Sequence, residues 1–243
     1  MNKNADLLKN CVESRLNFLN KGYYNKVSDK LNEYIYEGQK DTKDKETIYN
    51  IVDSGCGPGF YMHQLKLYLN SKGINNDNIC GFDISEEAIN LAKKTFKDIS
   101  FFYGDVNSIP LPDKSQNAIV CVFSYKNYKE YNRILKDNGK VYIVTSGGKN
   151  HFKEILSKFG IEKEKDFKKM ENEFKSANFR ENNREFLEYQ INLKTNEDIL
   201  EIIDTIPYHL EFPQEKLNYF KNLNNLDLTA SFCFLEIEKV KDI

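Results

Sequence analysis

The sequence predicts an α/β fold, a doubly wound, mostly parallel sheet of seven strands with helices on both faces. From residue 47 to 159, short apolar runs alternate with helical patterns, which is the order found in proteins with parallel sheets. Right-handed crossovers between parallel strands make such a sheet doubly wound. Two late strand patterns, 185–193 and 228–240, predict an antiparallel hairpin added at one edge.

The first 45 residues predict a helical extension. Apolar residues recur at helical spacing from Leu7 to Leu19, Gly22 interrupts the run, and a second apolar stripe extends from Val27 to Ile35. Residues 39–46 are charged and polar, so they predict a solvated loop. We therefore expect an extension over 1–45 and a main domain over 46–243.

The main domain divides into short strand and helix patterns. The predicted strands are 47–53, 78–83, 99–103, 117–123, 140–145, 185–193 and 228–240. The predicted helices are 59–70, 85–96, 128–135, 152–159, 196–204 and 214–222. Residues 161–184 carry many charges of both signs, so we expect a charged insertion that forms a solvated helix or a mobile segment.

Composition excludes several classes of protein. The 243 residues are 40% hydrophobic and 13% aromatic, enough to bury a sizeable core, so global disorder is excluded. No apolar run reaches the roughly 18 residues of a membrane span, and residues 1–19 lack the apolar core of a signal peptide. A cytoplasmic protein without a membrane partner is the expectation.

The charge and the cysteine content bear on three further classes of protein, which are nucleic-acid binders, zinc-binding proteins and disulfide-bonded proteins. Lys and Arg number 35 against 37 Asp and Glu, a net charge of −2, whereas nucleic-acid binders usually carry a basic excess. The five cysteines are scattered and never form a C-x-x-C pair, which supports neither a zinc ribbon nor a disulfide framework. We expect reduced thiols and no bound metal.

A glycine-rich run, Asp53-Ser54-Gly55-Cys56-Gly57-Pro58-Gly59, follows the first predicted strand and opens a helix. Its glycines let the backbone turn sharply and approach a ligand, and the helix start offers free N–H groups. A dinucleotide-binding G-x-G-x-x-G motif would need glycine where Phe60 stands. Cys56 is expected to be a small spacer rather than a reactive thiol.

Three further segments follow in order. The second predicted strand ends in Asp83, where a carboxylate can accept both ribose hydroxyls of a nucleoside. The third predicted strand is followed by Gly104-Asp105-Val106. Before the fifth predicted strand, residues 133–139 read Arg-Ile-Leu-Lys-Asp-Asn-Gly. The alternatives are that Asp83 caps the following helix, although Ser85 suits that role better, and that Asp105 is a turn residue.

Together these four segments resemble the motifs of the class I S-adenosylmethionine-dependent methyltransferases, which have a Rossmann-like fold. The resemblance implies S-adenosyl-L-methionine as cofactor and S-adenosyl-L-homocysteine as product. It also implies the cofactor-binding residues, which are Asp53, Ser54, Gly55, Cys56, Gly57, Gly59, Tyr61, Asp83, Ile84, Asp105, Val106, Phe123 and, as a lid, Tyr24. For Tyr24, packing is the alternative.

The chain also resembles a narrower family, the bacterial 23S rRNA (guanine-N1-)-methyltransferases. The matching segments cover most of residues 11–240 and are Arg15 with Phe18-Leu19, Gly22-Tyr23-Tyr24, Gly59–His63, Thr145–Leu156 and Thr205–Tyr208. It departs from the family in three ways. No cysteine-rich zinc module is present, Tyr125 stands at a usual proline, and Leu210-Glu211 replace Trp-Arg.

Methyl transfer from a sulfonium is an in-line displacement, so the protein mainly aligns the acceptor and excludes water. If the acceptor is guanine N1, its proton must leave, and a nearby base would help. The candidates for contact with the acceptor are Tyr125, His151, Tyr208 and His209. Each has a structural alternative: Tyr125 packs, His151 caps a helix near Phe152, and His209 lines a loop.

Two enzyme functions and one other function remain open at this point. The resemblance implies a methyltransferase acting on guanine N1 of ribosomal RNA. The alternative is a methyltransferase for a small-molecule acceptor that lacks the RNA-binding module. A non-enzymatic cofactor-binding protein is disfavoured by the intact glycine run with Asp53 and Asp83.

Overall fold

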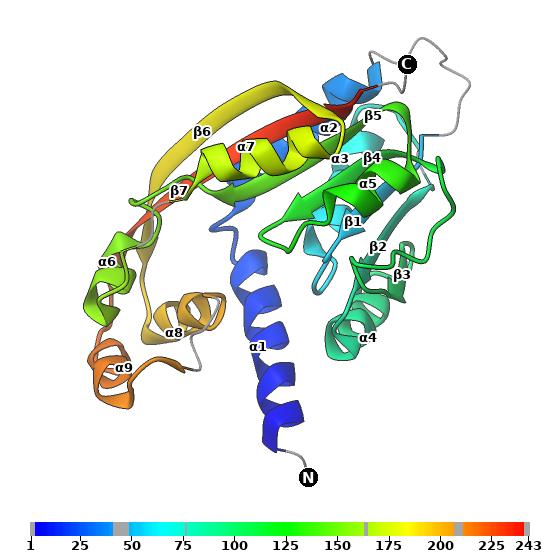
Figure 1. The fold of residues 1–243 in the computed structure, drawn as a ribbon. Coiled ribbons are helices and arrows are strands. Elements are labelled where there is room, and N and C mark those ends of the chain that lie inside the picture. The colour runs from blue at the N-terminus through cyan, green and yellow to red at the C-terminus, as the bar shows by residue number, and fades with distance from the viewer. Residues whose placement is uncertain (1–2, 41–48, 76, 163–164, 207–210, 241–243) are drawn as a thin grey trace. The chain divides into compact units, whose positions relative to one another are not determined.

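The computed structural model describes residues 3–40, 49–75, 77–162, 165–206 and 211–240 (Figure 1). Within these ranges the strands form one seven-stranded sheet in the order β3-β2-β1-β4-β5-β7-β6. The strands are β1 Ile51–Ser54, β2 Ile79–Asp83, β3 Ser100–Tyr103, β4 Gln116–Val122, β5 Leu135–Ser146, β6 Phe179–Leu193 and β7 Leu226–Lys239. The predicted sheet with an antiparallel edge is confirmed.

The helices of the described ranges connect these strands. They are α1 Lys3–Asn20, α2 Asn25–Lys40, α3 Phe60–Ser71, α4 Glu86–Thr95, α5 Tyr128–Ile134, α6 Lys153–Leu156 with a 3-10 turn η1 Ser157–Phe159, α7 Phe167–Ser176, α8 Asn196–Asp204 and α9 Gln214–Lys221. None of the helices described is both long enough and apolar enough to cross a membrane.

The parallel part of the sheet places the glycine run at a topological switch point. β1 pairs in parallel with β2 on one side and with β4 on the other. After β1 the chain continues outward to β2 and β3, then returns to β4 and β5 on the opposite side. The crevice beyond the carboxyl ends of the strands at such a reversal is where open α/β sheets bind ligands.

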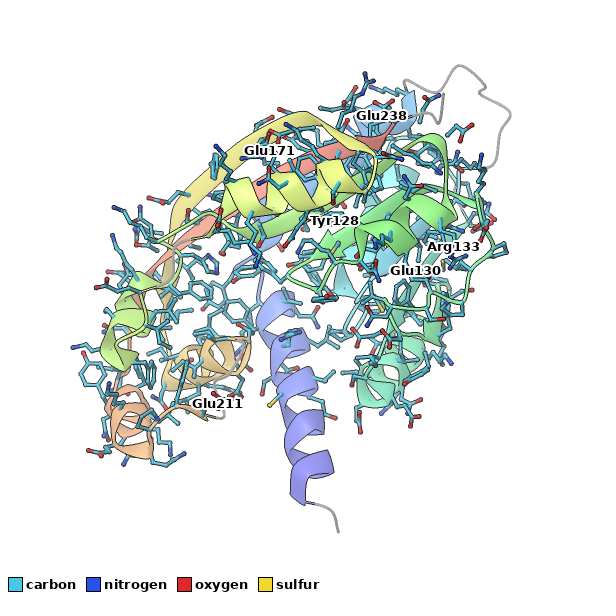
Figure 2. The ribbon with its side chains drawn as sticks, viewed as in Figure 1. Tyr128, Glu130, Arg133, Glu171, Glu211 and Glu238 are labelled. Carbon is cyan, nitrogen blue, oxygen red and sulfur yellow. The ribbon has the colours of Figure 1, made fainter. Side chains whose placement is uncertain are left out.

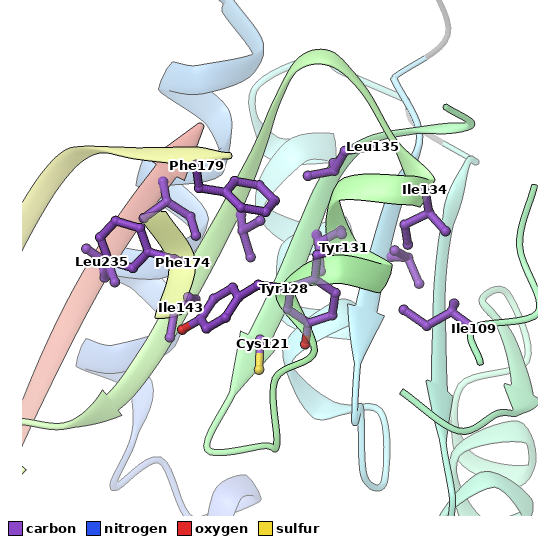
Figure 3. Close-up of a cluster of buried hydrophobic side chains, with 14 of the residues drawn as sticks. Ile109, Cys121, Tyr128, Tyr131, Ile134, Leu135, Ile143, Phe174, Phe179 and Leu235 are labelled. Carbon is purple, nitrogen blue, oxygen red and sulfur yellow. The ribbon is translucent and has the colours of Figure 1, made fainter. Parts of the chain in front are cut away.

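The charged segment 161–184 contains a helix, one of the two forms expected for it, but one face of this helix is buried. It contains helix α7, which buries Met170 and Phe174, and β6 already begins at Phe179 rather than at residue 185. Met170 and Phe174 are four residues apart, so they share one helix face. Figure 3 shows Phe174 and Phe179 in a cluster of buried side chains with Tyr128 and Leu235.

The chain divides into two compact units, each built from several stretches. The first contains 1–25, 146–165 and 186–232, and the second contains 26–145, 166–185 and 233–243. The second unit holds the glycine run and the strands β1 to β4. The expected boundary near residue 45 stays a prediction.

Within the first unit, Lys21 neutralises two buried carboxylates of α8. Its Nζ lies 2.8 Å from Asp198 Oδ1 and 2.7 Å from Glu201 Oε2, and the Tyr23 hydroxyl donates to Asp198 Oδ2 at 3.0 Å.

Lys21→Met leaves the two carboxylates side by side without a counter-charge. We expect the free energy of unfolding to fall by about 2 kcal/mol, since a third of the lysine side chain is exposed. Urea denaturation measures this, with the exposed Lys216→Met as control, and equal stability of both variants would contradict it.

Candidate functional site

The glycine run forms a tight loop between β1 and α3. Gly55, Gly57 and Gly59 have φ angles of 76°, 53° and 85°, in the left-handed region that favours glycine. The backbone N–H groups of Gly55 and Cys56 both donate to the carbonyl of Phe82 at 2.9 Å. The loop is thereby tied to the neighbouring strand β2.

The space around the loop is filled on one side and open on the other. A Cβ added to Gly55 would lie 1.9 Å from Ser124 Oγ, whereas one added to Gly57 would meet nothing within 4 Å. Gly55 is therefore required by close packing inside the protein. Gly57 faces open space, which fits a loop whose backbone approaches a ligand.

Asp53, the third residue of β1, is buried. Its side chain is 1% exposed, and neither carboxylate oxygen has a hydrogen-bond partner among the residues that the structure describes. Burial first, and then the nearby charge of Asp83, raise the pKa of Asp53 from 3.8 to about 8. An orphaned carboxyl group at this position fits a ligand that brings hydrogen-bond donors or positive charge.

This pKa has a consequence for stability. Between pH 4 and 8 the folded chain keeps a proton on Asp53 that the unfolded chain releases. The free energy of unfolding should therefore fall as the pH rises through this range, by up to about 1.4 kcal/mol per pH unit. Asp53→Asn removes this contribution, so the wild type should lose stability relative to the variant from pH 5 to pH 8. Urea unfolding of both proteins measures the difference, and a constant difference would contradict the prediction.

Asp83 ends β2 and faces the loop. Its Oδ2 accepts the N–H of Gly57 at 2.9 Å, and its Oδ1 accepts the N–H of Ser85 at 2.9 Å. The N-cap of α4 is Ser85, whose Oγ accepts the N–H of Ala88 at 3.2 Å, so the capping alternative for Asp83 is wrong. Each carboxylate oxygen keeps a further acceptor position, as binding of two hydroxyl groups requires.

Asp105 and Val106 begin the connection after β3. Asp105 Oδ1 accepts from the backbone N–H and the side-chain amide of Asn107, at 2.8 and 3.0 Å, so Asp105 does form a turn. Val106 packs against the buried cluster of the second unit. The turn leaves the second carboxylate oxygen of Asp105 for other donors.

Arg133, from the fourth sequence match, holds the chain that follows Asp105. Its guanidinium donates to the carbonyls of Ile109 and Leu111 at 2.8 and 2.9 Å and pairs with Glu130 at 2.8 Å (Figure 2). Glu130 in turn accepts the N–H of Ile109 at 2.8 Å, and the hydrogen bond from Arg133 lowers the pKa of Glu130. This motif therefore stabilises a loop of the candidate site.

Large apolar side chains are exposed where β2, β3 and β4 end. Ile84 is 62% exposed, Tyr103 56%, Phe123 42% and Tyr125 71%. The sequence prediction includes three of these residues and misses Tyr103, which lies directly beside Asp83 in the β2–β3 register. Its position as the last residue of a strand pattern before Gly104 is the signal that could have found it.

The remaining predicted residues of the second unit are buried. Ser54 is fully buried, and its Oγ accepts a hydrogen bond from the Tyr131 hydroxyl at 2.8 Å. Tyr61 is buried on α3 with its ring edge-on to Phe60. Burial raises the pKa of the Cys56 thiol well above its ordinary value, which agrees with a spacer and disfavours a thiolate nucleophile.

In the first unit, Phe232 brings two predicted residues together. The rings of Tyr24 and His151 both meet it edge-on, with centroids 5.1 and 5.2 Å away. His151 Nδ1 accepts the N–H of Ser231 at 3.2 Å, and burial lowers the pKa of His151 to about 4. Helix α6 is capped by Phe152 without a side-chain bond, so the capping alternative for His151 is wrong. The predicted Tyr208 and His209 lie outside the described residues.

No metal centre is evident in the described part of the chain, where no three His, Cys, Asp or Glu side chains are grouped to hold an ion. All five cysteines are free thiols.

Comparison with known proteins identifies this arrangement. A family model described as "Methyltransferase domain" matches residues 45–205. YxjB of Bacillus subtilis, provisionally named a 23S rRNA (guanine-N(1)-)-methyltransferase, is 32% identical over 118 residues, 48% of this chain and 40% of that protein. The demethylmenaquinone methyltransferase of Chlorobaculum tepidum is 26% identical over 129 residues, 50% of this chain and 48% of that enzyme. The chain thus spans less than half the length of these curated relatives.

Solved structures agree on the fold. A S-adenosylmethionine-dependent methyltransferase of Methanosarcina mazei superposes with a TM-score of 0.51 at 18% identity, covering 81% of this chain and 95% of that one. The family match covers well over half of the sequence and includes the glycine loop, Asp83 and Asp105. The chain belongs to the methyltransferase-domain family.

Proposed function

We propose that the carboxyl ends of β1 to β4 bind S-adenosylmethionine. The residues that would hold it in the second unit are Asp53, Ser54, Gly55, Cys56, Gly57, Gly59, Tyr61, Asp83, Ile84, Asp105, Val106 and Phe123. Two observations support the fit, the orphaned carboxyl group of Asp53 and the open space at Gly57. When bound, the cofactor supplies a methyl group activated on a positively charged sulfonium. The lid role of Tyr24 stays a prediction.

Each part of the site then has a separate task. Asp83 would accept the ribose hydroxyls while it keeps the Gly57 N–H in place. Asp53 would lie near the positive charge of the cofactor, which favours its ionised form. Apolar Ile84 and Phe123 would exclude water from the reacting groups.

We propose guanine N1 of ribosomal RNA as the acceptor. The observation that carries this proposal is the 32% identity to YxjB over 118 residues. The reaction removes the N1 proton. Tyr125 of the second unit and His151 of the first unit each stay a separate prediction for acceptor contact. With a pKa near 4, His151 is neutral at pH 7 and binds a proton weakly, so it fits a hydrogen-bonding role better than that of a general base.

A small aromatic acceptor is the second candidate function. The identity to the demethylmenaquinone methyltransferase favours it, as do the exposed rings of Tyr103, Phe123 and Tyr125 at one end of the sheet. Such rings offer stacking surfaces to a quinone or a nucleobase alike.

The test is a direct competition of acceptors. The full chain is incubated with methyl-labelled S-adenosylmethionine and either unmodified 23S rRNA transcript or a demethylated quinol, and products are identified by mass spectrometry. We expect labelled 1-methylguanosine from the transcript, and much less of it with Asp83→Ala at the same cofactor concentration. Label in the quinol alone would replace the first candidate by the second, and label at another RNA position would refute guanine N1.

A further inference from the structure

A buried pair of hydroxyl groups joins the glycine loop to α5. The Tyr131 hydroxyl donates to Ser54 Oγ at 2.8 Å, and neither side chain is exposed to solvent. Ser54 directly precedes Gly55 of the glycine loop. Tyr131 lies 77 positions after Ser54 in the chain. Both residues belong to the second unit.

The same tyrosine also reaches the loop after β4. Its hydroxyl lies 3.4 Å from the carbonyl oxygen of Tyr125, which can share the proton in a weak bifurcated arrangement. The Cys121 thiol points at the carbonyls of Ser124 and Tyr125, at 3.7 and 3.9 Å. Figure 3 shows Tyr131 and Cys121 together in the buried cluster.

We term residues 123–127, which follow β4, the β4 loop. Contacts with neighbouring segments hold this loop in its conformation. Phe123 has a φ of 53°, an unfavourable left-handed conformation for a bulky residue, and its N–H donates to Val144 at 2.9 Å. Ser124 Oγ occupies the space that a Cβ atom would take if residue 55 were not glycine. The β4 loop and the glycine loop are therefore fitted to one another.

We propose that Tyr131 is a positioning residue that holds the β4 loop against the glycine loop, so that the cofactor side and the Tyr125 side of the site keep one fixed geometry. The inference rests on the proposed cofactor site and names a residue that the sequence motifs do not contain. Tyr131 touches no reacting group in this account. It acts through Ser54 and through the backbone of Tyr125.

The neighbouring Tyr128 provides a matched control. It lies on the same helix and in the same cluster, and its buried hydroxyl has no hydrogen-bond partner among the described residues. Tyr128→Phe therefore removes a buried hydroxyl without removing a link between the loops. Tyr131→Phe removes the link and leaves Ser54 Oγ unpaired.

Hydrogen exchange followed by mass spectrometry tests the proposal on the ligand-free full chain. In Tyr131→Phe we expect the amides of residues 123–127 and 54–59 to exchange about tenfold faster, the size expected from the loss of one buried hydrogen bond. Tyr128→Phe should leave both segments at the wild-type rate. Unchanged exchange of the β4 loop in Tyr131→Phe would overturn the proposal.

The double variant Ser54→Ala/Tyr131→Phe separates positioning from a merely structural role. Replacing both partners by apolar groups removes the unpaired hydroxyl, so the melting temperature should return close to that of the wild type. The β4 loop should still exchange fast, and kcat should be lowered about tenfold both in Tyr131→Phe and in the double variant. Recovery of stability, loop protection and kcat together would show that Tyr131 is only structural.

The outcome for Tyr131 can be read independently of the proposed function. If S-adenosylhomocysteine fails to bind the wild type in calorimetry, the cofactor site is wrong, whereas the exchange rates of the ligand-free variants still report on the link between the loops. If it binds and protects residues 123–127 in the wild type, that protection should be lost in Tyr131→Phe and kept in Tyr128→Phe.

Discussion

Asp83→Ala is expected to weaken the binding of S-adenosylhomocysteine by about 10- to 100-fold, the range for losing hydrogen bonds to a charged group. The carboxylate has two tasks in the proposed site. It would accept the ribose hydroxyls, and it already accepts the N–H groups of Gly57 and Ser85. Removing it leaves two N–H groups to find other partners and removes the acceptor at the end of β2. Isothermal titration calorimetry measures the affinity.

Asp137→Ala is the matched control for this variant. Asp137 is a half-exposed carboxylate with an ion pair to Lys114 at 3.3 Å, of the kind that contributes little to stability. We expect it to bind S-adenosylhomocysteine as the wild type does. Asp83→Asn, which keeps an acceptor oxygen, should lie between the wild type and the alanine variant. Equal affinity of the wild type and Asp83→Ala, in folded proteins, would remove Asp83 from the site.

Gly57→Ala is expected to abolish detectable cofactor binding while the protein remains folded. The added methyl group meets no atom of the protein within 4 Å, so it would project into the space proposed for the cofactor. The φ of 53° costs an alanine residue roughly 1–2 kcal/mol, which a folded domain of this size tolerates. Calorimetry should therefore detect no binding, while a thermal melt of the same protein should still show a cooperative unfolding transition.

Gly73→Ala separates backbone strain from obstruction of the site. Gly73 follows α3, has a φ of 77°, and its added Cβ would also meet nothing within 4 Å. This variant carries the same kind of strain at a distance from the glycine loop, so its melting temperature should drop like that of Gly57→Ala while its affinity stays unchanged. A Gly57→Ala protein that binds the cofactor normally would show that the open space is not used.

The position of the glycine loop and Asp83 could be predicted because their signals are local. Strand period, turn glycines and an acid at a strand end are read within a few residues, and parallel pairing brings the ends of β1 and β2 together. Phe123 and Tyr125, which the sequence analysis names for cofactor and acceptor contact, follow the end of β4, and their roles stay predictions.

Other features depend on contacts between distant residues. Ser54 meets Tyr131 only after α5 packs on the sheet, and nothing in the sequence around either residue indicates the pair. The buried face of helix α7 could not be predicted because charged neighbours outnumber Met170 and Phe174, which pack in the core with the partly buried Phe167. The low pKa of His151 likewise arises from burial, which local sequence does not specify.

The central claim is that the second unit holds the methyl donor where β1 and β2 end. Photo-crosslinking of radiolabelled S-adenosylmethionine to the full chain, followed by peptide mapping, tests it most directly. We expect the label in peptides that cover residues 53–61 or 83–106, with little label in Gly57→Ala. Label confined to peptides from 186–232, or equal labelling of the wild type and Gly57→Ala, would contradict the claim.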